Sequence, residues 1–114
     1  MSVSVSSVLE LIGRLVAGSA DCRGTAADRA TDWTQAFDDT QAAIISRVLL
    51  WLALVETDDT AREAQLHALA ELAEFARVPA EVLRDVRQLS RAELHGSSIE
   101  HFDYLRSFGT DESG

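Results

Sequence analysis

Histidine and carboxylate side chains spaced four residues apart are the groups in this chain best suited to metal chemistry. His67 lies four residues after Glu63 and four before Glu71, and Glu74 follows three residues later. Residues four apart share one face of a helix, so an imidazole and carboxylates can meet there. A metal site in a helical bundle also needs ligands from a facing helix, and the neighbouring apolar segment offers none. We therefore expect a solvated face and no bound metal.

A second polar group lies near the end of the chain. Its members are His95, Glu100, His101, Asp103 and Tyr104. A histidine beside a carboxylate can act as a general base. However, no serine or cysteine occupies a recognisable nucleophile motif, and no glycine-rich loop follows a strand pattern. The residues around Gly96 are more simply a turn and a helix cap. We predict no catalytic residue, no cofactor and no enzymatic activity.

Acidic residues gather around the second predicted helix and the turn that follows it. The expected partner-binding residues are Asp38, Asp39, Glu56, Asp58, Asp59 and Glu63, with His101 and Tyr104 as secondary candidates. An ordinary solvated surface is the simpler interpretation of such acids. The functional interpretation is a negative patch that captures a basic protein, with association that is accelerated by electrostatic steering and weakened by salt.

Length and charge limit the classes of function. The 114 residues suffice for one domain, which we expect over residues 1–109, followed by an acidic tail over 110–114. Acidic side chains number 19 against 10 basic ones, and the net charge is -9. Nucleic acid and anionic membranes repel a domain with this much negative charge. We therefore expect neither as a partner. A basic protein is the partner that this charge favours.

Cysteine usage and the N-terminus predict a compartment. Cys22 is the single cysteine, so an intrachain disulfide and a cysteine-rich zinc site are excluded. A free thiol fits the reducing cytosol. Residues 1–16 lack the basic start of a signal peptide. The stretch 42–55, which is apolar except for Ser46 and Arg47, is too short to cross a bilayer. We expect a cytoplasmic protein.

Apolar residues recur at helical spacing along most of the chain, and no stretch alternates as a strand would. The predicted helices cover residues 4–17, 32–56, 60–76, 79–89 and 97–108. Residues 19–31 contain no large apolar side chain and predict a long surface loop. The fold class is therefore all-α, a compact bundle of about five helices. We expect the third and fourth helices to form a tight antiparallel pair, similar to HEAT packing.

The second predicted helix is apolar around its whole circumference near its end. A helix of this kind is normally buried on several sides, so we expect it to lie at the centre of the bundle. The residues predicted to be in the core are Leu49, Leu50, Trp51, Leu52 and Leu54. The alternative is that one face of this helix forms a homodimer interface, so we expect a monomer or a homodimer.

Two segments carry a resemblance to a known class of protein. They are the alanine-, leucine- and glutamate-rich run 61–72 and the run 93–105. Together they resemble small all-helical immunity proteins that accompany bacterial polymorphic toxins. The resemblance implies a stoichiometric inhibitor that binds one cognate toxin domain and has no catalysis of its own. The alternatives are a helical adaptor unrelated to toxins and a small enzyme that uses His67 or the group from His95 to Tyr104.

Overall fold

The computed structural model describes residues 2–109, and these residues are all-helical with no strand. The α-helices are α1 (Val5–Leu15), α2 (Ala20–Asp32), α3 (Asp39–Val55), α4 (Asp59–Glu74), α5 (Ala80–Asp85) and α6 (Ser97–Gly109). Two 3₁₀ turns, Val86–Gln88 and Arg91–Glu93, connect α5 to α6. The predicted fold class is confirmed. The expected acidic tail lies outside the described residues.

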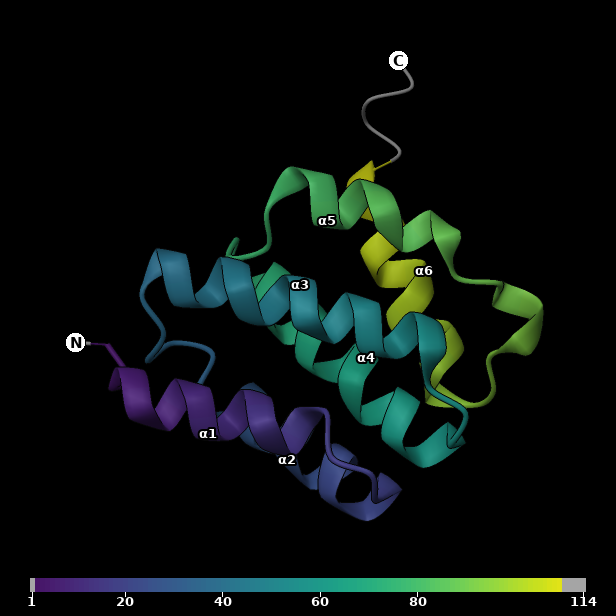
Figure 1. Ribbon diagram of the computed structural model, residues 1–114. Helices are drawn as coiled ribbons and strands as arrows, with labels where there is room; N and C mark the ends of the chain where they lie inside the picture. The colour runs from purple at the N-terminus through teal and green to yellow at the C-terminus, as the bar shows by residue number, and fades with distance from the viewer. Residues whose placement is uncertain (1, 110–114) are drawn as a thin grey trace.

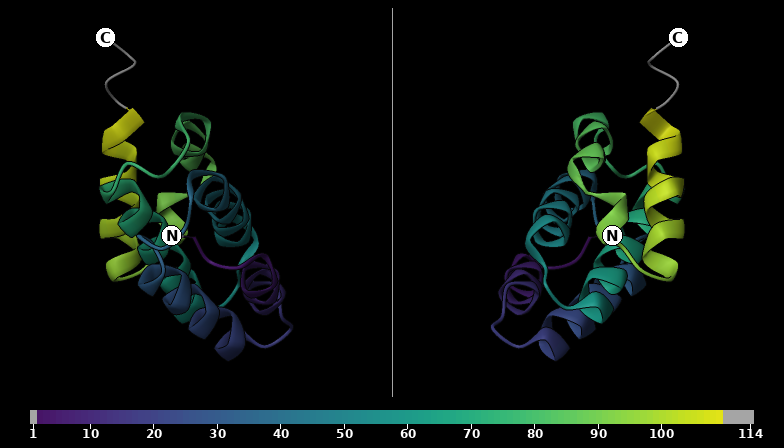
Figure 2. Two further views of the ribbon diagram at one scale, coloured as in Figure 1. Left: turned by 90° about the vertical axis from the view of Figure 1, so that its left-hand side faces the viewer. Right: turned by 90° about the vertical axis from the view of Figure 1, so that its right-hand side faces the viewer.

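The helices form two layers. Figures 1 and 2 show α1, α3 and α5 in one layer and α2, α4 and α6 in the other. Consecutive helices pack as antiparallel hairpins, α1 on α2, α3 on α4 and α5 on α6. The smallest dimension is 17 Å, as expected for two helical layers about 10 Å apart. The expected pairing of residues 60–76 with 79–89 is wrong, because α5 packs on α6 and not on α4.

The central helix is α4, not the apolar α3. It packs extensively on α2, α3 and α6, whereas α3 packs mainly on α4 and makes fewer contacts with α1 and α5. Leu49, Leu50 and Leu52 are buried as predicted. The core prediction fails for Trp51, which is 69% exposed, and for Leu54, which is 36% exposed. A two-layer arrangement explains this result, because it buries one side of each helix and leaves the other in solvent.

The segment predicted as a loop folds into α2. Its N-cap is Ser19, whose side chain accepts a hydrogen bond from the backbone N–H of Cys22 at 3.3 Å. Its buried residues are Ala26, Ala27 and Ala30. Alanine favours helix, and small side chains let two helices approach closely, so α2 needs no large apolar residue to pack on α4.

The long helix predicted over residues 32–56 begins later in the structure: α2 ends at Asp32, residues 33–38 are not helical, and α3 begins at Asp39. Asp38 is the N-cap of α3. Its side chain accepts a hydrogen bond from the backbone N–H of Gln41, and the side chain of Gln41 accepts one from the backbone N–H of Asp38. Asp38 and Asp39 therefore mark the start of α3. Among residues 2–109, none of the helices is both long and apolar enough to span a membrane.

The C-terminus of α4 is followed by the one non-glycine residue among residues 2–109 with a left-handed backbone conformation. Ala76 has φ +57°, and the N–H of Arg77 donates to the carbonyl of Leu72 at 2.9 Å. Together with the Ala76 to Ala73 bond of 3.0 Å, this is a Schellman C-cap. Ala76 is exposed, because the helix ends before it.

We predict that Ala76→Gly stabilises the protein by about 0.5–1 kcal/mol. Glycine adopts the left-handed conformation without the Cβ clash that alanine carries, and this relief exceeds its larger unfolded-state entropy. Urea denaturation measures the change. The control is Ala43→Gly inside α3, which should lose about 1 kcal/mol. A less stable Ala76→Gly protein would contradict the assignment.

Candidate partner-binding site

The turn between α3 and α4 is built around one buried carboxylate. Glu56 is 4% exposed, although we expected it to be a surface contact, so that expectation is wrong. Arg23 of α2 donates to both of its oxygens, from Nε and from Nη2, each at 2.7 Å. Gln65 of α4 donates to Oε1 at 2.8 Å. Glu56 is therefore a structural residue that joins three helices.

The same carboxylate fixes the backbone of the turn. The N–H groups of Thr57 and Asp58 both donate to Glu56 Oε2 at 3.1 Å. The hydrogen bonds from Arg23 lower the pKa of Glu56 from 4.5 to about 2; burial opposes this shift, and the Asp58 and Gln65 bonds support it. The carboxylate is consequently ionised at neutral pH in spite of its burial.

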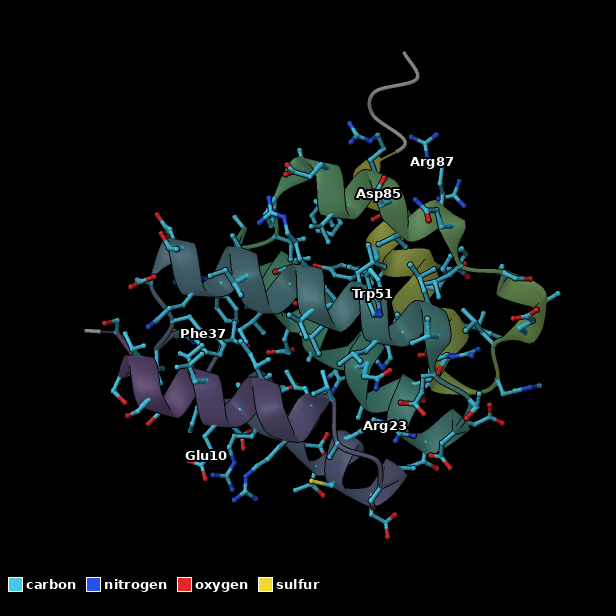
Figure 3. The ribbon with its side chains drawn as sticks, in the orientation of Figure 1. Glu10, Arg23, Phe37, Trp51, Asp85 and Arg87 are labelled. Carbon is cyan, nitrogen blue, oxygen red and sulfur yellow. The ribbon has the colours of Figure 1, made fainter. Side chains whose placement is uncertain are left out.

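Arginine side chains extend this network to the surrounding backbone. Arg23 Nη1 donates to the carbonyl of Ala17 at 2.9 Å, which ties the α1–α2 connection to the turn. Arg62 of α4 donates to the carbonyl of Glu56. Figure 3 shows Arg23 at this end of the molecule, close to where α1 passes into α2. The backbone of the α3–α4 turn is therefore held from several directions.

Two exposed aspartates stand on this fixed backbone. Asp58 is the N-cap of α4, and its Oδ2 accepts a hydrogen bond from the N–H of Ala61 at 2.8 Å. Asp59, the first residue of α4, has a side chain that is 69% exposed and lies 3.9 Å from His95 Nε2. Negative charge at this position is favoured by the positive end of the helix dipole. Both aspartates are surface carboxylates, as predicted.

Glu63 and His101, two of the predicted partner-binding residues, lie next to each other in the structure. His101 Nε2 lies 2.9 Å from Glu63 Oε2, and this contact joins α6 to α4. The ring of His67 stacks on that of His101, with centroids 5.1 Å apart. Within residues 2–109 no group of three or more such side chains is arranged to hold a metal ion. Glu63 therefore faces a histidine of α6.

The remaining polar residues of α6 have separate surroundings. Asp103 accepts hydrogen bonds from Arg91 at 3.0 Å through both oxygens. Tyr104 is 38% exposed, and its ring meets that of Phe108 edge to face at 5.2 Å. Tyr104 is thus available at the surface, one helical turn from His101.

Asp38 and Asp39 lie at the opposite end of α3 from the turn. The 17 residues of α3 separate them from it by about 25 Å. Asp38 caps the helix, and Asp39 contacts Arg77 Nη2 at 3.2 Å. The structure therefore divides the predicted acidic group into two. We call Asp58, Asp59 and Glu63 the acidic turn.

Sequence reasoning missed a groove between the C-terminal parts of α1 and α3. It has a volume of about 650 Å³, and its lining includes Val16, Arg47, Val48, Trp51, Leu52 and Val55. Figure 3 shows Trp51 on the C-terminal half of α3. The signal that could have found it is the apolar stripe that continues around α3 after its buried side is complete.

Comparisons of this chain with protein-family models, with curated proteins and with solved structures find no match.

We predict that Glu56→Gln destabilises the protein by about 3 kcal/mol. The variant leaves the largely buried Arg23 guanidinium without its counter-ion, and removing one partner of a buried pair is costly. Urea denaturation measures the loss. Glu10→Gln is the control, because the Glu10–Arg14 pair is exposed and should contribute less than about 0.5 kcal/mol. Equal losses in the two variants would contradict the structural role of Glu56.

The stability difference between the wild-type protein and Glu56→Gln should depend on pH. The folded-state pKa of Glu56 lies below its ordinary value, so its stabilisation is complete above about pH 4.5 and is lost as the pH falls toward 2. The shift corresponds to about 3 kcal/mol. Denaturation at a series of pH values should show the two proteins converging in acid. A constant difference would contradict the lowered pKa.

Proposed function

We propose that this chain is a stoichiometric protein inhibitor, of the immunity-protein kind, that binds a basic toxin domain and catalyses no reaction. The observation that carries this proposal is the acidic turn. Its three carboxylates are accessible to solvent, and its backbone is fixed by the buried Glu56 network. A rigid binding surface loses little conformational entropy when a partner binds.

Charge favours a basic partner at this end of the molecule. The net charge of -9 attracts a cationic domain at long range, and the acidic turn offers acceptors for arginine and lysine at short range. His101 and Tyr104 are proposed as neighbouring contacts, because aromatic residues are enriched in interfaces. Action in the cytoplasm is part of the proposal, since the single cysteine is free.

A helical adaptor without a toxin partner is the second candidate. The exposed Trp51 and the groove beside it favour this candidate, because such a surface binds apolar partners whatever their charge. The two candidates differ in their response to salt. Binding through the acidic turn weakens with salt, whereas binding through an apolar groove does not.

We predict that Asp59→Arg slows association with the partner by about tenfold at low salt. The probe is the product of the gene next to this one, and the measurement is its association rate on immobilised protein. Asp39→Arg is the matched control, because Asp39 is likewise the first residue of a helix capped by an aspartate but lies at the other end of α3.

The proposal requires Asp59→Arg to act while Asp39→Arg leaves the rate nearly unchanged. The wild-type protein should also rescue cells that express the neighbouring product, and Asp59→Arg should rescue them less well. Equal effects of the two variants would refute the acidic turn as the contact. Absence of both a complex and a rescue would refute the inhibitor function with this partner.

A further inference from the structure

The helices α1 and α3 each carry a stripe of apolar residues that are exposed or only partly buried. Both stripes follow the spacing i, i+4, i+7, i+11, which keeps four residues on one side of a helix. They are Val5, Leu9, Ile12 and Val16 on α1, and Ile44, Val48, Trp51 and Val55 on α3. Val16 of α1 shares the groove with Val48, Trp51 and Val55 of α3, so the stripes meet there. We call these eight residues the α1–α3 face.

The α1–α3 face exposes an apolar area that approaches the apolar area of a homodimer interface. Six of its residues are between 43% and 72% exposed: Val5, Leu9, Val16, Ile44, Trp51 and Val55. With about 100 Å² for an aliphatic side chain and about 200 Å² for an indole, they leave roughly 400–500 Å² of apolar surface in solvent. A standard interface takes about 800 Å² from each partner, of which about 65% is apolar in homodimers.

The charges beside this face are already paired within the chain. Arg47 contacts Glu81 of α5 at 2.5 Å, and Arg23 is held by Glu56. The groove therefore presents balanced charge, although the chain as a whole carries -9. A basic partner is drawn toward the exposed carboxylates and gains little here. A partner whose contact surface is apolar and electrically balanced fits the α1–α3 face better than a basic partner does.

We infer that the α1–α3 face binds a second copy of this chain and forms a two-fold symmetric dimer. Such a dimer needs a surface that is complementary to itself. The α1–α3 face meets this condition, because Trp51 is 69% exposed and forms part of the wall of a groove of about 650 Å³. A two-fold axis near Trp51 places the indole of each copy in the groove of the other. The stripes of α1 and α3 then cover those of the partner.

Sedimentation across a concentration series tests the dimer. The wild-type protein should reach twice its 12.4 kDa chain mass at micromolar concentrations. Trp51→Ser should weaken dimerisation at least about 30-fold, as for a central aromatic residue of an interface, and Leu9→Ser should weaken it less. Both side chains are exposed in the monomer, so neither change removes a core residue. Phe75→Ser, an exposed aromatic outside the face, is the control and should leave the dimer intact.

Fluorescence supplies a second measurement. The chain has two tryptophans, and Trp33→Phe leaves Trp51 as the sole reporter. Its emission should move to shorter wavelength as the concentration rises, because the indole leaves water. Added salt should strengthen the dimer by screening the repulsion between two negative chains. Binding through the acidic turn should weaken under the same conditions, so the two proposals fail independently.

Three outcomes would overturn the inference. The first is a wild-type protein that stays at 12.4 kDa up to about millimolar concentration. The second is a dimer that Trp51→Ser and Leu9→Ser leave unchanged, which would place the contact elsewhere. The third is a monomer whose complex with the neighbouring gene product is abolished by Trp51→Ser, which would make a different protein the occupant.

Discussion

The structure depends on the neutralisation of one buried carboxylate. Glu56 ends α3, and the groups that satisfy it come from α2, from α4 and from the turn itself. An ionised carboxylate without them would cost several kcal/mol, so the conformation of the turn and the positions of both layers are linked. The same network orients Asp58 to cap α4. The Glu56 network thus stabilises the fold and also holds the acidic turn in place.

The helices could be predicted from the sequence where large apolar residues recur at helical spacing, as in α1, α4 and α6. The failure at α2 has a physical cause, because its buried positions are alanines. A pattern that searches for large side chains finds none there. The closeness of α2 to α4 appears only in three dimensions, where a Cβ at Gly24 would lie 3.6 Å from the Cα of Ala61. The glycine and alanine residues of this segment suggested a loop in the sequence. In the structure they allow α2 and α4 to pack closely.

The site was predictable in its residue types but not in its surroundings. Asp58 and Asp59 are exposed acids at a helix start, which local sequence indicates directly. Glu56 looks the same in sequence, yet its partner Arg23 lies 33 residues away. The apolar run of α3 similarly suggested burial on every side. Whether Trp51 is covered depends on how many layers surround α3, and helical periodicity carries no information about that number.

The two proposed contacts make opposite demands on charge, and this links them. Repulsion between chains of net charge -9 opposes pairing through the α1–α3 face, while the same charge attracts a basic partner to the acidic turn. A bound cationic domain reduces the net charge of each complex and so weakens the repulsion between two of them. By reciprocity, pairing then strengthens the binding of that domain. If both contacts exist, the inhibited state is therefore more strongly dimeric than the free protein, without any change in the structure of either site.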